Sequence, residues 1–459
     1  MQGSLIKTKY SVWLLGSFLT LFGGFLRVDV LVNTQVIKPV RADAVDYFWY
    51  AYNINQHGIY SKSPEDLKTP DNIRPPAMPF VASFFLNTNP LKYSEALTAD
   101  HAEQMIKPFL FMQMLISVLL IPILFFALKK IANISIAFLA TFLHVISPHL
   151  INANIYFLTE SLNASIFVVL ICCIIFSLKQ KTYSAFFGIG LTLAAASLLK
   201  ASAMLVFVPL SCAYIYSSSK QTRKKMFKLL LATYSIFAVL YGAWLFRNAT
   251  IVGDTVSKTL STNFLHHGIY PNMKYQEEEV SYGFPYRFDP RANEINESKS
   301  TVLQEIKRRF SEEPAKHIEW YLLGKPLLFW SWEIIAGMGD SFIYPVKNSP
   351  YFDQEILKLT HFLAYYSHNI CLFLALLAVI TCLFKPCNYL LNKELSQLQI
   401  LLAAIVAYYT LIHMVGAPFP RYSIPLRPLI YTLGAIQCFN IFLNIKTLAA
   451  KLRGENFAK

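Results

Sequence analysis

The residues best suited to chemistry come directly after the first apolar run of the chain. Two carboxylates, Asp43 and Asp46, lie among aromatic residues in the segment 41–52, and an Arg74-Pro75-Pro76 turn follows. A carboxylate can accept a proton, and an arginine can hold an anion through its planar fork of N–H groups. Because the segment lies where an apolar chain meets water, it suits chemistry on a lipid-linked substrate.

Both acids also have a purely structural interpretation. Four apolar residues recur at the spacing of one helical face: Val45, Phe48, Trp49 and Tyr52. This pattern predicts an amphipathic helix over 44–57 that lies in the outer membrane interface. Asp43 is its expected N-cap, Asp46 an N3 residue that complements the helix dipole, and Gly58 the stop. The acidic pair alone therefore does not define a catalytic site.

The composition identifies the chain as an integral, all-α polytopic membrane protein. Of its 459 residues, 55% are hydrophobic and only 15% are charged, and apolar runs of near-spanning length recur. An eleventh crossing at 318–339 would invert the charge pattern downstream, so that segment is predicted to be an outer helix lying on the membrane. Ten runs are predicted to cross: 11–28, 108–128, 132–148, 155–178, 183–199, 202–217, 227–246, 362–384, 397–416 and 424–445.

The net charge of +14 is distributed as in a membrane protein, which argues against a nucleic-acid partner. Lysine and arginine gather on alternate connections, so both termini are predicted to be cytoplasmic. The first helix is predicted to be retained, since no small-residue processing site follows it and Arg27 ends it. Two long outer loops, 29–107 and 247–361, are predicted within one transmembrane domain, 1–450, before a short cytoplasmic tail, 451–459.

Several classes of protein have no support in the sequence. All seven cysteines fall in predicted helices or beside cytoplasmic connections, which excludes a disulfide framework in the outer loops. No Gly-rich phosphate loop is present, so nucleotide hydrolysis is not indicated. A lipid flippase or transporter would predict charges near the middle of the membrane and an internal repeat, and the sequence has neither.

A second set of charges gathers at the outer ends of the predicted spans. Each of these side chains could be an interfacial anchor. Together they oppose the positive-inside bias and carry an energetic cost, which an anionic lipid phosphate bound among them would explain most simply. The set consists of Glu160, Lys200, Arg247, Arg421 and Arg427.

The order of the motifs resembles the GT-C superfamily of membrane glycosyltransferases. The branch most similar contains the bacterial protein mannosyltransferase-like and lipid A aminoarabinose transferase-like enzymes. The similarity covers roughly residues 10 to 440, with each motif degenerate. The motifs are Asp43-x-x-x-Tyr47 to Gly58-x-Tyr60, Arg74-Pro75-Pro76-x-x-Pro79, Ser147-Pro148 to Leu158-Thr159-Glu160-Ser161-Leu162, Trp244-Leu-Phe-Arg247-Asn248 with Gly253, and Arg421-Tyr422-Ser-Ile-Pro425.

The resemblance implies an enzyme of the bacterial inner membrane, active in the cell envelope. Such an enzyme moves a sugar from a polyprenyl (undecaprenyl) phosphate to a lipid, glycan or protein acceptor on the outer face, as in lipopolysaccharide or protein glycosylation, by an inverting single displacement. The resemblance assigns catalysis to Asp43 and Asp46. It assigns binding of the donor phosphate to Arg74, Lys200, Arg247 and Arg421, and supporting roles to Tyr47, Glu160, Asn248 and Tyr422.

Two departures from that family pattern bear on a metal. Ala44 and Ile73 stand where acids are frequent in the family, so a metal site built on those acids is not expected. His266 and His267 in the second outer loop stay candidate ligands for a divalent metal. No other cofactor is implied.

One enzymatic alternative keeps the lipid carrier and changes the unit that is transferred. Ligases and polymerases that handle diphosphate-linked glycans usually concentrate arginines in one large loop and need no early carboxylate pair. Asp43 is therefore the residue that separates this alternative from the leading interpretation.

The alternation of basic connections makes a topological prediction. In a cysteine-free background, Lys62→Cys, Leu150→Cys, Tyr275→Cys and Pro350→Cys should react with an impermeant thiol reagent added outside, whereas Thr222→Cys should not. Labelling at position 222 together with protection at 275 would reverse the orientation.

Overall fold

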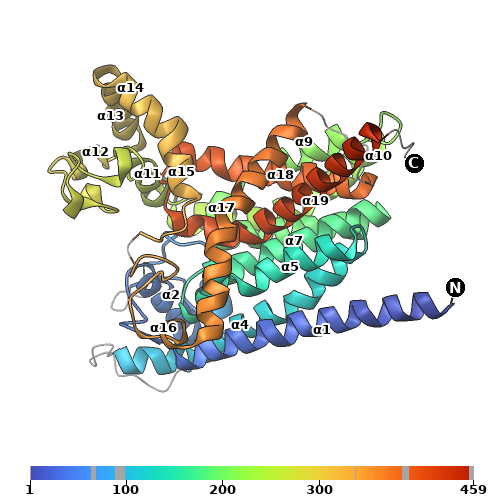
Figure 1. Ribbon diagram of the computed structural model, residues 1–459. Coiled ribbons are helices and arrows are strands. Elements are labelled where there is room, and N and C mark those ends of the chain that lie inside the picture. The colour runs from blue at the N-terminus through green and yellow to red at the C-terminus, as the bar shows by residue number, and fades with distance from the viewer. Residues whose placement is uncertain (1, 64–68, 88–98, 336, 385–391, 454–459) are drawn as a thin grey trace.

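The computed structural model is mostly helical and describes residues 2–63, 69–87, 99–335, 337–384 and 392–453. Figure 1 shows the long helices packed in one bundle, with the N-terminal end of α1 and the C-terminal end of α19 at the same end of the bundle. The bundle comprises α1 (Gln2–Asn33), α4 (Ala99–Lys129), α5 (Ile134–Ile146), α6 (Pro148–Asn152), α7 (Glu160–Gln180), α8 (Tyr183–Leu199), α9 (Phe207–Ser217), α10 (Arg223–Arg247), α17 (Glu355–Phe384), α18 (Lys393–Val415) and α19 (Arg427–Leu452).

The predicted fold class is confirmed, because this is a multi-pass helical membrane protein. Every predicted apolar run coincides with a helix. Within the described residues, 7 helices are long and apolar enough to cross a membrane, or 8 if α5 and α6, bent by 52°, form one span. The runs at 183–199 and 202–217 form shorter apolar helices. The first helix ends at Asn33, beyond the end predicted at Arg27.

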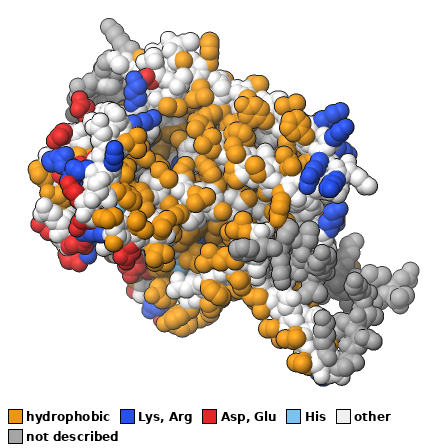
Figure 2. All heavy atoms as spheres, turned by 90° about the horizontal axis from the view of Figure 1, so that it is seen from above, with side chains coloured by type: hydrophobic (Ala, Val, Ile, Leu, Met, Phe, Trp, Pro, Cys, Tyr) orange, Lys and Arg blue, Asp and Glu red, His pale blue; other side chains and the backbone are white. Residues whose placement is uncertain are grey.

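The surface has the polarity that a bilayer requires. Large apolar side chains are exposed along the spanning helices, for example Leu21 on α1, Phe246 on α10 and Phe373 on α17. Figure 2 shows this apolar band between one end that carries both acidic and basic side chains and an opposite end that carries lysine and arginine. The basic end agrees with the charge alternation on which the predicted orientation rests.

A layer of short elements covers the end opposite the termini (Figure 1). A two-stranded antiparallel sheet pairs Gln35 with Asn348 and thereby joins the two loops. The segment predicted as one helix at 318–339 consists of α14, a π-turn at Trp320–Gly324, α15 and a loop. The layer contains β1 (Gln35–Val36), α2 (Asp43–His57), α3 (Ala77–Ser83), α11 (Lys258–His266), α12 (Ala292–Ile295), α13 (Lys299–Glu312), α14 (Pro314–Glu319), α15 (Lys325–Phe329), β2 (Val346–Asn348) and α16 (Pro350–Asp353).

The second loop has its own small core and one close backbone contact with the bundle. Ile269, Tyr270, Ile295 and Val302 form this core. The end of α11 meets the end of α18 at Gly268, where an added Cβ would lie 2.4 Å from the carbonyl oxygen of Gly416. A side chain at position 268 would therefore push α11 away from the bundle.

The exposure of the proposed labelling positions divides them into two groups. Leu150 and Pro350 are buried, so a cysteine at either position would stay unreactive whichever way the protein is oriented. Lys62 and Tyr275, which are partly exposed, carry the topological test together with Thr222.

Arg27 is a fully buried cation that joins three helices. Its Nε donates to Ser117 Oγ at 2.9 Å, and its other nitrogens donate to the carbonyl oxygens of Gly23, His144 and Val145 at 3.1–3.2 Å. These bonds tie α1 to α4 and α5 because a buried guanidinium needs partners for its N–H groups.

The Arg27→Ala substitution should destabilise the fold. It would leave buried acceptors unpaired and open a cavity, at a cost of about 3 kcal/mol. Thermal unfolding in detergent would measure the loss, with Arg41→Ala, at a partly exposed position, as the control. An unchanged midpoint for Arg27→Ala would mean that α1 is not held by this residue.

Candidate active site

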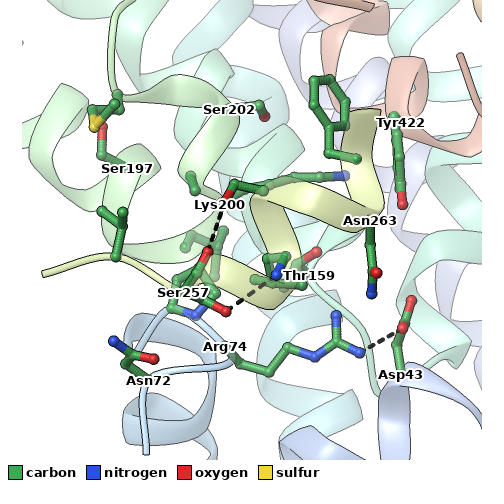
Figure 3. A pocket seen from close by; sticks show the side chains of 18 of the residues that line it. Asp43, Asn72, Arg74, Thr159, Ser197, Lys200, Ser202, Ser257, Asn263 and Tyr422 are labelled. Carbon is green, nitrogen blue, oxygen red and sulfur yellow. Dashed lines mark hydrogen bonds and ion pairs between the residues drawn. The ribbon is translucent and has the colours of Figure 1, made fainter. Parts of the chain in front are cut away.

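A cavity of about 500 Å³ lies where the outer layer meets the bundle. Its walls come from α2 and the loop that carries Arg74, from α7, α8, α10, α11 and α18, and from the 3₁₀ segment Pro420–Leu426 that precedes α19. Several predicted site residues converge on it, and Figure 3 shows Arg74 pointing at Asp43 while Lys200 reaches across towards Tyr422. The charged residues of the lining are Asp43, Arg74, Glu160, Lys200, Lys299 and Arg421.

The predicted helix-cap role of Asp43 is wrong. Helix α2 begins at Asp43 itself, its N-cap is Ala42 at φ 47°, and no side chain caps its amides. Asp46 is accordingly the fourth helical residue, one position beyond the predicted N3. Gly58 does end the helix, in the left-handed conformation that was expected. The side chain of Asp43 is thereby free to face the cavity.

Asp43 instead joins two arginines from distant parts of the chain. Its Oδ1 accepts from Arg74 Nη2 at 2.7 Å, and its Oδ2 accepts from Arg421 Nη2. On the far side, Arg421 Nε lies 3.5 Å from Glu160 Oε1. Two loops and helix α7 therefore meet in one ion-pair network.

This network sets the protonation of Asp43. Burial by itself would raise the pKa of the carboxyl, but the charges of Arg421 and Arg74, together with their hydrogen bonds, hold the pKa well below its ordinary range. Burial opposes the charge of Arg74 as well, but Tyr47, Asp43 and Asp46 together raise the pKa of its guanidinium. Asp43 is thus ionised at neutral pH and strongly paired.

Asp46 lies behind Arg74 and does not line the cavity. Its Oδ2 accepts from Arg74 Nε at 2.9 Å, and its Oδ1 lies 3.7 Å from Lys62 Nζ. The guanidinium of Arg74 is therefore held by two carboxylates at once, and it stands over the ring of Tyr47 at 5.4 Å. Asp46 and Tyr47 fix the direction in which Arg74 points.

Lys200 is a cation in the cavity that carries no ion pair among the described residues. It follows the last residue of α8, and its Nζ stands 3.9 Å from the centre of the Tyr422 ring. Burial lowers the pKa of Lys200 to about 8, so the ammonium is still mostly protonated at neutral pH. Tyr422 also lies under Arg421, at 5.6 Å.

Arg247 lies next to the cavity and points away from it. Its Nη1 donates to the carbonyl oxygen of Asp71 at 2.7 Å, and Nη2 approaches that of Tyr60 at 3.5 Å. Asn248, which does line the cavity, donates to the carbonyl oxygen of Thr255 at 3.0 Å. Arg247 therefore organises the loop that carries Arg74.

Arg427 does not belong to the cluster in which the sequence analysis placed it. It is fully buried, bonds to His368, and donates to the carbonyl oxygen of Ser331 at 3.2 Å. It is absent from the cavity lining.

His266 and His267 do not form a metal site with neighbouring residues. Nε2 of His266 bonds to the hydroxyl of Tyr270 at 3.0 Å, while His267 lines the cavity and stacks on Tyr286 with ring centres 3.8 Å apart. Within the described residues, no group of three or more His, Cys, Asp or Glu side chains could hold a metal ion. The donor set does not fit a divalent metal.

Helix α11 is the part of the site that the sequence analysis missed. Ser257 caps it by accepting from the amide of Leu260 at 3.2 Å, and one side of the helix covers the cavity. A serine before a short amphipathic run was the available signal. The lining residues from this segment are Ser257, Leu260, Ser261, Asn263 and Phe264.

The rest of the lining is largely apolar, with Leu199, Met204, Trp244 and Ile412 facing the same space as the charges. Such a wall lowers the local polarity and strengthens the ion pairs beside it.

The geometry of Arg247 predicts a specific consequence of its removal. Arg247→Ala should loosen residues 69–76 and so displace Arg74, and hydrogen exchange of the backbone amides in this segment would measure the effect. Arg247→Lys should restore protection from exchange only in part, because the planar guanidinium is replaced by an ammonium that acts as a point charge. Unchanged protection in Arg247→Ala would contradict the structural role.

Comparison with known proteins gives a fold and no sequence match. No model of a protein family matches the sequence, and no curated protein matches it. The Archaeoglobus fulgidus oligosaccharyltransferase in the apo form aligns over 98% of this chain and 53% of its own, with 12% identity and a TM-score of 0.50. The same enzyme tethered to an acceptor peptide aligns with a TM-score of 0.50 at 11% identity, over 98% of this chain and 52% of its own.

This chain thus spans about half the length of the oligosaccharyltransferase chains it matches. ArnT from Cupriavidus metallidurans bound to undecaprenyl phosphate aligns over 93% of this chain and 77% of its own, with 11% identity and a TM-score of 0.41. The likeness to the oligosaccharyltransferase extends over almost the whole bundle and outer layer. The chain therefore shares the fold of this part of the oligosaccharyltransferase, which agrees with the fold expected from the resemblance to the GT-C superfamily.

Proposed function

We propose that this protein is a membrane glycosyltransferase that takes a sugar from a polyprenyl phosphate and transfers it, with inversion, to a hydroxyl group of an acceptor. The observation that carries the proposal is one cavity that holds a carboxylate, Asp43, and an ammonium, Lys200, which has no ion-pair partner in the described part of the chain. The reaction needs a group that accepts the proton of the acceptor hydroxyl and a cation that stabilises the departing phosphate. Asp43 and Lys200 supply these two groups.

The charge of the lining favours an anion. Four cations line the cavity (Arg74, Lys200, Lys299 and Arg421), against two carboxylates, Asp43 and Glu160. The excess of positive charge is enough to hold a phosphate and to stabilise it as it departs. Lys200 is the first contact we assign to it, because the two arginines already have carboxylate partners and Lys299 is exposed.

The proposed step is a single displacement. The oxygen of the acceptor hydroxyl attacks the anomeric carbon, its proton passes to the carboxylate of Asp43, and the bond from the anomeric carbon to the phosphate oxygen breaks. The bonding electron pair leaves with the polyprenyl phosphate, whose charge the cations stabilise. Among the described residues no group of three or more His, Cys, Asp or Glu side chains could hold a metal ion, and the step we propose is written with side chains alone.

The apolar wall and the topology support the rest of the assignment. Leu199, Met204, Trp244 and Ile412 offer a surface for the prenyl units next to the phosphate. The positive-inside pattern puts the cavity on the outer face, and so in the periplasm if the host is a bacterium with two membranes. The acceptor is a lipid, a glycan or a protein with a free hydroxyl group.

Asp43→Asn tests the proposal because it keeps the shape of the side chain and removes its ability to accept a proton. Transfer should fall on the order of a hundredfold or more. Thermal stability should also fall, because Arg74 and Arg421 lose a carboxylate partner, so transfer is compared in protein shown to be folded. Masses of glycolipids and surface polysaccharides from cells with the wild-type and variant genes would report the loss and also name the sugar and acceptor.

A matched control makes the same chemical change at an exposed ion pair. Asp254 pairs with Lys258 at 2.9 Å on the surface, and Asp254→Asn should keep transfer intact. Retained transfer in folded Asp43→Asn protein would remove the proposed base.

A further inference from the structure

The proposed base is held in a state unsuited to its task. Both oxygens of Asp43 are occupied by arginines, and the pKa of the carboxyl is lowered by the charges of Arg421 and Arg74 against the effect of burial. A carboxylate with a depressed pKa is a weak proton acceptor. Something must therefore loosen at least one of these pairs before transfer.

Arg421 is the partner with an alternative. Its Nη2 contacts Asp43, while its Nε lies 3.5 Å from Oε1 of Glu160, which is longer than a hydrogen bond. Glu160 is only 2% exposed, and its Oε2 has no hydrogen-bond partner among the described residues. A buried carboxylate oxygen without a partner is costly, so a further N–H donor at Oε2 of Glu160 would be stabilising.

We propose that Glu160 is a positioning residue that takes Arg421 over from Asp43 when a phosphate enters the cavity, so that Asp43 becomes free to accept a proton. The inference rests on the proposed function, because it assigns Glu160 a part in the same reaction.

The charges of the network favour this exchange. A phosphate on Lys200 competes with Asp43 for the Nη groups of Arg421, and the planar guanidinium can keep one edge on Glu160 while it turns. The turn would bring N–H groups to both oxygens of Glu160 and satisfy the unpaired one. Arg74 can stay in place, because Asp46 holds it at 2.9 Å.

The exchange couples the base to the donor. Without a phosphate, Asp43 stays paired and cannot activate an acceptor or a water molecule. With a phosphate in place, the proton acceptor is released beside the bond that will break. Glu160 acts through Arg421 and need not touch the sugar.

The experiment measures the protonation of Asp43 directly and needs no knowledge of the sugar. A diazo reagent that esterifies protonated carboxyl groups is applied at about pH 5.5, where labelling rises about tenfold for each unit by which the pKa of the carboxyl rises. The peptide that contains Asp43 is quantified by mass spectrometry. The probe is undecaprenyl phosphate, and undecaprenol is the control without a phosphate.

The wild-type protein should show at least about a tenfold rise in Asp43 labelling with undecaprenyl phosphate and no rise with undecaprenol. Glu160→Gln leaves Asp43 as the sole carboxylate partner of Arg421, so Asp43 labelling in this variant should rise less than about twofold with undecaprenyl phosphate. Glu160→Asp keeps the negative charge and should recover part of the wild-type rise in labelling. Glu305→Gln, which neutralises a buried glutamate of the outer loop (3% side-chain exposure), should keep the full rise.

The comparison between variants isolates Arg421 because the other groups around Asp43 are unchanged. Stabilisation against heat by undecaprenyl phosphate shows in each variant that the protein is folded and binds the probe. The groups that surround Asp43 are Asp46 and Tyr47 on its own helix and Arg74, Glu160, Lys200, His267, Tyr286, Tyr344, Arg421 and Tyr422 on the elements around it.

Each contrary outcome has one meaning. An equal rise in Glu160→Gln and wild type overturns the role of Glu160 and leaves the proposed function standing. Bound undecaprenyl phosphate without a rise in the wild type overturns the release of Asp43. No stabilisation of the wild type by undecaprenyl phosphate overturns the proposed function, and this inference with it.

Discussion

The pairing of Asp43 with two arginines is the interaction on which the rest of the site depends. It joins the first outer loop, through Arg74, to the segment before the last helix, through Arg421, across 378 positions of sequence. A partly buried ion pair of this kind is held best where each member has further partners. Asp46 and Glu160 supply them, so the position of each charge determines that of the next.

The low polarity of the bundle strengthens the attraction between these charges and also restricts where they can lie. Arg27 and Arg427 show the other way in which the fold keeps a buried guanidinium, since backbone carbonyl groups and uncharged side chains take their N–H groups. Such bonds hold helices together and offer nothing to a ligand. The cavity differs because its cations face carboxylates and open space, where an anionic ligand can replace a partner.

The outer layer completes the site with elements that belong to different loops. Helix α11 covers the cavity from the second loop, and α2 presents Asp43 from the first. The short β-pairing and the Gly268–Gly416 contact hold these pieces against the bundle. Precise placement thus comes from loop segments that pack on rigid helices, as is usual for binding and catalytic residues.

Local pattern in the sequence determined the helices and the chemical nature of the site. The apolar runs predicted the bundle because a spanning helix must bury its backbone polar groups within itself. Gly58 ended α2 as expected, since its left-handed conformation is a local property. The motif order also named Asp43, Arg74 and Arg421, and these three residues line one cavity in the structure.

Only the tertiary structure decided which partner each charge takes. The local pattern favoured Asp43 as a helix cap, and the motif order grouped Arg247 with the ligands of an anion. In the structure Asp43 pairs with arginines and Arg247 binds backbone carbonyl groups. Neither the local pattern nor the motif order gave a sign that α11 covers the cavity or that Glu160 keeps an unpaired oxygen. These features depend on contacts between segments far apart in the chain, and residue type and spacing do not encode the angles at which such segments meet.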